Sequence, residues 1–192
     1  MELIRGLLRG AWARFPSARA LTFRSRPGRV MCLAINGAGL GHLTRCLAIA
    51  DRLRILAPES EIVFLTTSTA VPQVHQAGYQ CHHIPSYELV APAVGPAAWN
   101  MHFFRMTEEV MHLHHPEILV FDGGEPYLGL RRAINLYRRR LRFVWVRRGA
   151  FKQDFKMAKL HAAESLFDRV ILPSEWGEAP DAGAMGKSYR IS

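Results

Sequence analysis

The sequence predicts an α/β protein built on a Rossmann-like parallel sheet of about six strands, with helices on both faces. Two observations support this fold class. Short apolar runs alternate with segments of helical periodicity from residue 30 to residue 173, and a glycine-rich turn directly follows the first apolar run. Such alternation is typical of parallel strands joined by right-handed helical crossovers. A chain of 192 residues, 49% of them hydrophobic, has room for one domain of this kind.

The expected elements follow one another in a regular order. The first apolar run is almost unbroken, which suits a strand buried on both faces of a sheet. Proline, glycine and charged residues separate the later segments. The expected strands are 30–35, 61–66, 79–84, 117–122, 142–146 and 168–173. The expected helices are 43–56, 69–77, 99–114, 127–139 and 155–167, with an apolar loop over 85–96.

The two ends of the chain lack this alternation. Residues 1–29 carry seven arginines and one glutamate, and the apolar residues up to position 15 fall on one helical stripe. We interpret 1–29 as a basic amphipathic extension and a linker. The extension would lie on an anionic membrane, act as a targeting peptide, or remain poorly ordered. Residues 174–192 lack periodicity and are interpreted as a tail or a truncated interdomain linker, which leaves 30–173 as the domain.

Positive charge is concentrated in two stretches of the chain. The formal net charge is +9, and residues 131–148 contain eight arginines and no acid, in addition to the basic N-terminal stretch. Such patches favour an anionic partner; a membrane surface or a phosphorylated substrate is expected, and nucleic acid is not. Phe143 and Trp145 alternate with valines as strand residues do, so their rings need not be base-stacking platforms. No apolar run is long enough for a transmembrane helix.

The three cysteines, Cys32, Cys46 and Cys81, are scattered along the chain. They are expected to be buried thiols in a reducing compartment, not a disulfide or zinc framework. A cytoplasmic location follows, with or without peripheral contact with the inner face of the membrane. No cofactor and no metal is expected.

The glycine-rich turn predicts an anion site. Gly37, Gly39 and Gly41 lie between the first strand and the first helix, where they allow a sharp turn and a close approach of ligand to backbone. The following helix would present unpaired N–H groups and the positive end of its dipole, which together favour a phosphate. The Gly-x-Gly-x-Gly-His spacing differs from the dinucleotide fingerprint, and no Lys-Ser or Lys-Thr follows it as in a P-loop.

The segment 36–45, Asn-Gly-Ala-Gly-Leu-Gly-His-Leu-Thr-Arg, resembles the N-terminal glycine-rich loop of GT-B glycosyltransferases, in particular the MurG-like group of family 28 and its predicted bacterial relatives. In that family the loop lies between two Rossmann-like domains and faces the acceptor, which is often lipid-linked or phosphate-bearing. The resemblance implies the same position for Gly39, Gly41 and His42. It covers residues 30–173, the acceptor-side half of such an enzyme.

The resemblance implies transfer of a sugar from a nucleotide sugar, a substrate and not a cofactor, to a hydroxyl or phosphate-bearing acceptor. In the family a second domain makes most contacts to the nucleotide sugar, so a separate donor-domain chain is an expected partner. Two alternatives stay open. The chain is a non-catalytic membrane-docking subunit that recruits a donor-binding chain, or it is an inactive truncated copy.

His42 is the best candidate for a catalytic residue. At a helix N-terminus its imidazole is expected to stay neutral, so it could accept a proton from an acceptor hydroxyl or hydrogen-bond a phosphate. A capping or packing histidine is the alternative. Thr44 and Arg45 follow in the first helical turn, where a hydroxyl and a guanidinium could contact phosphate oxygens. A solvent-exposed helix charge is an equal alternative for Arg45.

Two further groups of residues are candidate sites. Asp122 and Glu125 follow a predicted strand at the binding edge of the sheet, where either could act as a base or bind sugar hydroxyls. Alternatively, Asp122 caps the next helix or fixes the turn. Glu108, His112 and His115 share one helical face, but a partly exposed polar face is preferred over a metal site.

Overall fold

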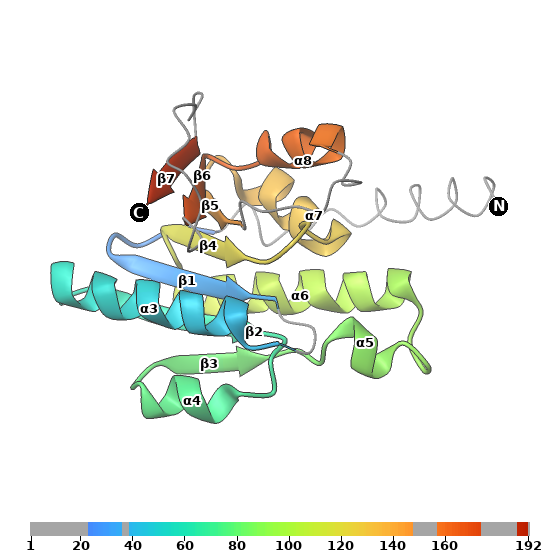
Figure 1. Cartoon of the computed structure of the whole chain (residues 1–192), viewed down its shortest axis with the longest axis horizontal. Coiled ribbons are helices and arrows are strands. Elements are labelled where there is room, and N and C mark those ends of the chain that lie inside the picture. The colour runs from blue at the N-terminus through green and yellow to red at the C-terminus, as the bar shows by residue number, and fades with distance from the viewer. Residues whose placement is uncertain (1–22, 36–38, 148–156, 174–187, 192) are drawn as a thin grey trace, which may run out of the picture.

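The computed structural model describes residues 23–35, 39–147, 157–173 and 188–191, and its centre is a sheet of seven parallel strands (Figure 1). The strand order is β3-β2-β1-β4-β5-β6-β7, so the chain winds outward from β1 in both directions. This order and the parallel pairing confirm the predicted Rossmann-like fold class. The strands are β1 (Arg29–Ala34), β2 (Glu61–Thr66), β3 (Gln80–His83), β4 (Ile118–Asp122), β5 (Arg142–Val146), β6 (Arg169–Pro173) and β7 (Ser188–Ile191).

Helices cover both faces of this sheet (Figure 1). Buried residues of α3 and α4 belong to the core on one face, and buried residues of α6, α7 and α8 belong to the core on the other. The described helices are α3 (Gly41–Leu56), α4 (Val71–Gln76), α5 (Tyr87–Val90), α6 (Pro96–His114), α7 (Leu128–Tyr137) and α8 (Met157–Glu164).

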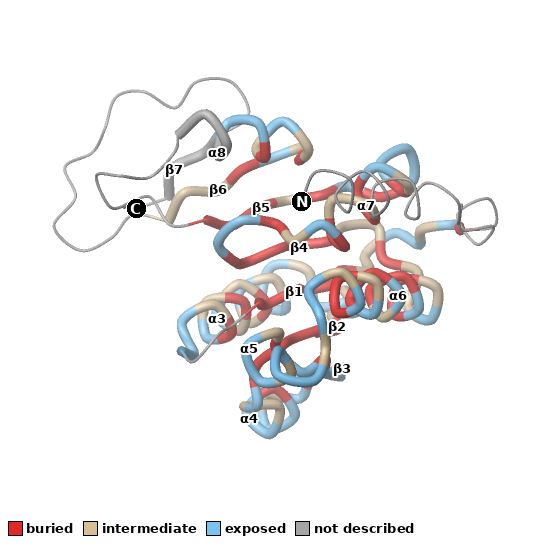
Figure 2. Tube along the Cα trace, turned by 90° about the vertical axis from the view of Figure 1, so that its right-hand side faces the viewer, coloured by how far each residue is buried: buried red, intermediate tan, exposed pale blue. Residues whose placement is uncertain are grey.

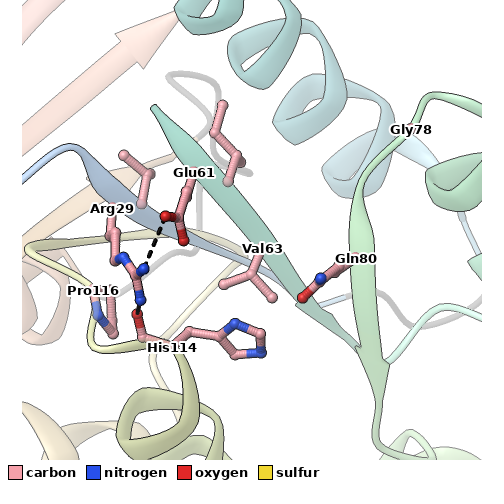
Figure 3. Close-up of a pocket in the computed structure, with 9 residues that line it drawn as sticks. Arg29, Glu61, Val63, Gly78, Gln80, His114 and Pro116 are labelled. Carbon is pink, nitrogen blue, oxygen red and sulfur yellow. Dashed lines mark hydrogen bonds and ion pairs between the residues drawn. The ribbon is translucent and has the colours of Figure 1, made fainter. Parts of the chain in front are cut away.

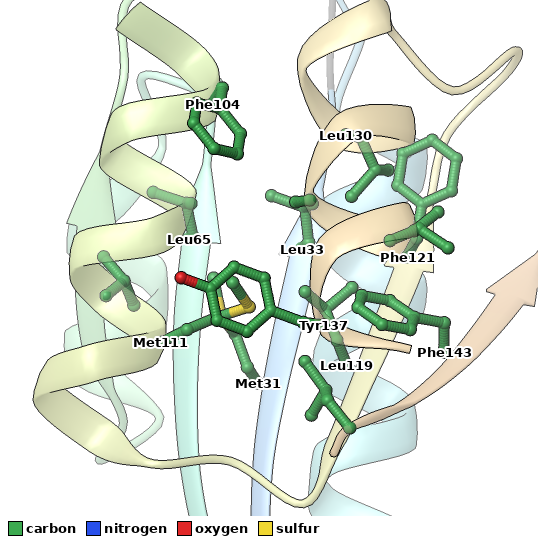
Figure 4. Close-up of a cluster of buried hydrophobic side chains, with 14 of the residues drawn as sticks. Met31, Leu33, Leu65, Phe104, Met111, Leu119, Phe121, Leu130, Tyr137 and Phe143 are labelled. Atoms are coloured by element: carbon green, nitrogen blue, oxygen red, sulfur yellow. The ribbon is translucent and has the colours of Figure 1, made fainter. Parts of the chain in front are cut away.

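The alternation of side chains along β1 separates the two layers of the core. Met31 and Leu33 face α6 and α7, whereas Cys32 and Ala34 face α3. All four side chains are fully buried, and Figure 2 shows that the central strands are buried along most of their length. Figure 4 shows the layer beneath α6 and α7, which includes Met31 and Leu33 of β1 and Tyr137 of α7.

A glycine lets α6 and α7 approach each other closely. A Cβ on Gly129 would lie 2.5 Å from the Asn100 carbonyl oxygen and 3.0 Å from the Phe103 ring. The Gly129 N–H also donates to Asn100 Oδ1 over 3.0 Å. The two helices therefore share a backbone contact that no larger residue would allow.

The predicted strands and helices are present, with small shifts at their ends. Helix α6 begins earlier than predicted, at Pro96, because a proline in the first helical turn removes no intrahelical hydrogen bond. The short helix α5 lies inside the segment predicted as a loop. Gly78 ends α4 with a φ of 84°, a conformation that glycine adopts without a steric penalty.

Two segments predicted to lie outside the domain contribute to it. Phe23, placed in the predicted linker, is 2% exposed, and its ring meets Tyr137 and His112 edge-on. Ser188–Ile191, placed in the predicted tail, forms β7 and pairs with β6. The predicted amphipathic stripe lies before residue 23, outside the described residues. None of the helices in the described part of the chain is long and apolar enough to cross a membrane.

The cysteines are free thiols. Cys32 and Cys46 are buried as predicted, and Cys81 is partly buried. Burial raises the pKa of Cys81 to about 11. The pKa of Cys46 is raised well above its usual value, because its thiol contacts that of Cys32 and because it is buried.

Candidate functional site

The glycine-rich loop and Asp122 meet where the strand order reverses. β1 and β4 are neighbours in the sheet, yet the chain continues from them to helices on opposite faces. The Ile35 N–H donates to the Asp122 carbonyl over 2.9 Å, which ties the two strand ends together. In open α/β sheets this position, beyond the carboxyl ends of the strands, is where ligands bind.

The N-terminus of α3 points its first amides toward this position. The helix begins at Gly41 with Leu40 as the N-cap residue, and no side chain caps it. The Thr44 N–H donates to the Leu40 carbonyl over 2.9 Å. The N–H groups of the residues before Thr44 therefore lie ahead of the first hydrogen bond within the helix. The Thr44 hydroxyl lies 3.2 Å from the carbonyls of Leu40 and Gly41 and thus contacts its own helix. Amides, and not this hydroxyl, are the groups best placed for an anion.

The loop glycines have open surroundings. A Cβ built on Gly39 or Gly41 would have no atom of the described chain within 4 Å, and neither residue has a positive φ. Neither packing within the described chain nor backbone conformation therefore requires glycine at these two positions. The absence of a side chain at these positions leaves space for a ligand to approach the backbone of the loop. Gly37 lies outside the described residues.

Asp122 holds two side chains of α3 beside the loop. Its Oδ1 lies 2.6 Å from His42 Nδ1, and Arg45 contacts both carboxylate oxygens, Nε to Oδ2 and Nη2 to Oδ1, at 2.6 Å each. The Asp122 side chain is fully buried, whereas those of His42 and Arg45 are about a quarter exposed. Charge-assisted hydrogen bonds from a bidentate arginine compensate for the hydration that the buried carboxylate has lost.

The same contact fixes the hydrogen-bonding role of His42. A carboxylate only accepts hydrogen bonds, so Nδ1 carries a hydrogen and donates it to Asp122. Nη2 of Arg45 lies 3.3 Å from this Nδ1, but it is also a donor, so that contact is not a hydrogen bond. In the neutral ring the lone pair then lies on Nε2. A histidine held in this tautomer by an acid is suited to accept a proton at Nε2.

Three of the predicted site residues, His42, Arg45 and Asp122, thus form one cluster. Asp122 does not cap α7, whose N-cap residue is Tyr127 and which has no side-chain cap. Arg45 is not a solvent-exposed helix charge, because Asp122 occupies its guanidinium. The alternative that Asp122 caps the next helix is therefore wrong, and so is the alternative that Arg45 is a solvent-exposed helix charge.

Glu125 is not part of this cluster. Its Oε1 lies 2.6 Å from Arg131 Nη2, and its side chain is half exposed. The neighbouring Gly123 is required by packing, since a Cβ there would lie 2.7 Å from the Phe121 ring. The Gly123 carbonyl also accepts a hydrogen bond from the Trp145 indole over 3.1 Å.

A buried hydroxyl cluster at the end of β2 was not among the predicted site residues. Thr66, Thr67 and Ser68 are buried at the carboxyl edge of the sheet. The Thr66 hydroxyl donates to the Ala34 carbonyl over 2.9 Å, and Ser68 Oγ accepts from the Ala70 N–H over 3.2 Å. The signal that could have identified it is a run of four hydroxyl residues, 66–69, that begins at the last position of an apolar strand.

The basic stretch is less exposed than its composition indicates. Arg147 is 8% exposed, and its Nη2 lies 2.6 Å from Glu164 Oε1. Arg131 pairs with Glu125, as described above. Within this stretch, the arginines that the structure describes as exposed are Arg138, Arg139, Arg140 and Arg142, at the turn after α7.

The three residues weighed as a metal site have other contacts. The Tyr137 hydroxyl donates to Glu108 Oε1 over 2.7 Å, and His112 Nε2 lies 3.1 Å from the same hydroxyl. His115 ends α6 in the left-handed conformation, and its ring centroid lies 6.1 Å from that of Phe23. Within the described ranges, no three histidine, cysteine or acidic side chains are arranged to hold a metal ion.

A cavity of about 300 Å³ lies at the opposite, amino-terminal edge of the sheet (Figure 3). Arg29 lines it and contacts Glu61 Oε1 at 2.8 Å and the His114 carbonyl at 3.0 Å. Its main charges are therefore paired with each other. It is also remote from His42, because the two edges of a parallel sheet are separated by the full length of the strands.

Fold and cluster together define a class of protein: a doubly wound α/β domain with a histidine, an arginine and a buried aspartate at its switch point. Comparison of the sequence with protein-family models and with curated proteins gives no match. Because many functions share this fold, the side chains at the switch point carry the functional proposal.

Proposed function

We propose that this domain is the acceptor-binding half of a glycosyltransferase that moves a sugar from a nucleotide sugar to a hydroxyl or phosphate-bearing acceptor. The observation that carries the proposal is the contact between His42 Nδ1 and the buried Asp122 carboxylate, beside the uncapped N-terminus of α3. The resemblance of the glycine-rich loop to that of GT-B enzymes supports the same function.

The proposed reaction uses His42 as the base. Nε2 of His42 takes the proton of the acceptor hydroxyl. At the same time the hydroxyl oxygen forms a bond to the anomeric carbon of the donor sugar. The bond between that carbon and the diphosphate oxygen breaks, and a nucleoside diphosphate leaves. Asp122 keeps the histidine in the required tautomer, and its negative charge stabilises the imidazolium that forms. A phosphate on the acceptor would bind at the α3 amides.

Exposed apolar side chains favour an acceptor with an apolar portion. Leu40, Leu89 and Leu128 are 43%, 63% and 63% exposed. They follow the carboxyl ends of β1, β3 and β4, so they border the same edge of the sheet as His42. A lipid-linked acceptor would cover such side chains while its phosphate reached the loop.

One observation favours the alternative of a non-catalytic subunit that docks a donor-binding chain. Arg45 and Thr44, which were expected to contact phosphate, are instead engaged by Asp122 and by the helix backbone. The amides of α3 would then be the main groups left for an acceptor phosphate. A purely structural role for the cluster predicts that its variants change folding and not sugar transfer.

The test is a transfer assay on the tagged chain purified from its native lysate with any bound donor-domain chain. Radiolabelled UDP-sugar is supplied, and label is counted in aqueous and solvent-extracted fractions. We expect transfer that His42→Ala reduces by about 100-fold or more, since a general base contributes that much. His75→Ala, at an exposed histidine of α4, is the matched control and should retain activity. Transfer that is equal in both variants would refute the role of His42.

A further inference from the structure

A second charged feature lies at the amino-terminal edge of the sheet, away from the glycine-rich loop. It is a cavity of about 470 Å³ between the turn that joins α7 to β5 and the segment that leads into β1. Five arginines and one acid line it: Arg24, Arg138, Arg139, Arg140, Arg142 and Glu117. A volume of this size is within the usual range for small-ligand sites.

The acid and one arginine of this cavity already have partners. Glu117 Oε2 accepts a hydrogen bond from the Gly28 N–H over 3.1 Å. Arg142 Nη1 lies 3.2 Å from Asp168 Oδ1. Arg24, Arg138, Arg139 and Arg140 have no ion pair with an acid in the part of the chain that the structure describes. Four arginines without an ion pair among the described residues therefore share one hollow, and Glu117 is the one acid among its lining residues.

The walls of the cavity are held in place by the core. Phe23 is buried against Tyr137, so the adjacent Arg24 is fixed beside the end of α7. On the other wall, Arg140 N–H and Leu141 N–H both donate to the Tyr137 carbonyl, over 2.8 and 3.1 Å. Both walls thus depend on the same buried tyrosine. The arginines are presented by an ordered turn and not by a free chain end.

Most backbone N–H groups along the α7 side of the cavity are already used within the fold. The N–H groups of Arg138, Arg140 and Arg142 are all bonded to carbonyls of the chain. Arginines near a helix C-terminus also offset the helix dipole, but that dipole amounts to only about half a charge, which one arginine balances. The remaining guanidiniums are in excess of what the fold requires.

We infer that this cavity binds a compact ligand that carries at least two phosphate groups, either free in solution or as the headgroup of a lipid. Guanidinium groups match phosphate oxygens with paired N–H donors, and several of them in one hollow exceed what a single phosphate can use. A bound diphosphate would also remove the mutual repulsion of the arginines. This inference does not depend on the proposed sugar transfer, because it concerns the opposite edge of the sheet.

The test measures binding of pyrophosphate to the full chain by calorimetry in low-salt buffer. The variant Arg139→Ala/Arg140→Ala removes two exposed guanidiniums. The control Arg52→Ala/Arg105→Ala removes two exposed arginines of α3 and α6, with the same change in net charge. We expect the first variant to weaken pyrophosphate binding about tenfold or more and the control to change it less than about twofold. Arg139→Lys/Arg140→Lys keeps the charge but lacks the bidentate donors, and it should also weaken binding.

A second arm identifies the source of the phosphates. Sedimentation with phosphatidylcholine vesicles that contain cardiolipin is compared with vesicles that contain phosphatidylglycerol at equal total charge. Binding to cardiolipin vesicles that is lost in Arg139→Ala/Arg140→Ala assigns the site to a lipid headgroup, and binding of pyrophosphate alone assigns it to a soluble diphosphate. Circular dichroism checks that each variant is folded.

Three results would overturn the inference. Neither probe binds, or both arginine pairs lower binding equally, or a single-stranded RNA binds more tightly than pyrophosphate and is lost in the same variant. The second result would describe a diffuse charge effect, and the third a nucleic-acid surface.

Discussion

Arg45 and Asp122, 77 positions apart in the chain, form a two-contact ion pair that joins the first turn of α3 to the end of β4. The aspartate is fully buried and the arginine only partly. Asp122 also holds His42, so a single carboxylate links the helix, the strand and the candidate base. The stability of the domain and the orientation of His42 therefore depend on the same group.

Replacing Asp122 tests how much its carboxylate contributes to the stability of the domain. Asp122→Asn removes the buried negative charge that pairs with Arg45 and lies beside His42. Breaking a buried pair in this way typically costs about 3–5 kcal/mol, so we expect a loss in the free energy of unfolding of that order. Urea unfolding followed by circular dichroism measures it.

Glu125→Gln is the control for this substitution, because it also breaks an ion pair with an arginine, at the half-exposed Glu125. An exposed pair contributes less than about 1 kcal/mol, so this variant should unfold close to the wild type. Equal losses in the two variants would contradict the distinction between a buried and an exposed carboxylate.

The contact between α6 and α7 gives a second prediction. Gly129→Ala places a Cβ 2.5 Å from the Asn100 carbonyl oxygen, so the helices must move apart. Overpacking of this kind costs about 1–3 kcal/mol, which should lower the unfolding midpoint. A Cβ on Gly124 would have no described atom within 4 Å, so Gly124→Ala is the matched control. A midpoint for Gly129→Ala as high as that of Gly124→Ala would argue against the close contact.

Most of the fold could be predicted because its strands have strong local signals. The run that forms β1 is apolar at nearly every position, since a central parallel strand is buried on both faces. β7 has no such signal: it is four residues long and contains Arg190. Phe23 falls in the predicted linker because residues 16–28 are rich in serine, arginine and proline. Its burial depends on Tyr137, which lies far along the chain.

The candidate site could be predicted only in part. The order of strands and helices places the residues after β1 and β4 at one edge of the sheet, so His42 and Asp122 were each identified from their position. Their contact and the position of Arg45 depend on how α3 packs across the strand ends. No spacing within either motif contains that information. The hydroxyls of Thr66 and Ser68 were missed because they serve the turn after β2 and belong to no recognised motif.

The cysteines give a prediction about chemical reactivity. The pKa of Cys46 is raised well above its usual value and that of Cys81 is raised to about 11, so little thiolate is present at either residue near neutral pH. Cys32 is buried, which keeps reagents away from its thiol. We expect slow alkylation by iodoacetamide in the native chain and fast alkylation in urea, with each site followed by mass spectrometry. Fast labelling of Cys81 without denaturant would mean that β3 opens readily, since Cys81 belongs to this edge strand.

A histidine pair predicts how stability depends on pH. Nε2 of His82, in β3, lies 2.8 Å from Nε2 of His114, at the end of α6. Burial lowers the pKa of both residues; for His114, the nearby His82 and Arg29 lower it further and Glu61 opposes them. Because both pKa values lie below that of histidine in the unfolded chain, the unfolded state takes up more protons as the pH falls. The contribution of this pair is therefore fully present above about pH 6.5 and is lost progressively below it.

The measurement is the urea midpoint at about pH 7.5 and about pH 5.5, which bracket the titration of histidine in the unfolded chain. The midpoint of the wild type should be lower at the acidic pH. In His82→Gln/His114→Gln the difference between the two midpoints should shrink, because neither side chain can take up a proton. His75→Gln, at an exposed histidine, should keep the wild-type difference. If His82→Gln/His114→Gln also keeps the wild-type difference between the two midpoints, groups other than His82 and His114 control the acid sensitivity, and the prediction is wrong.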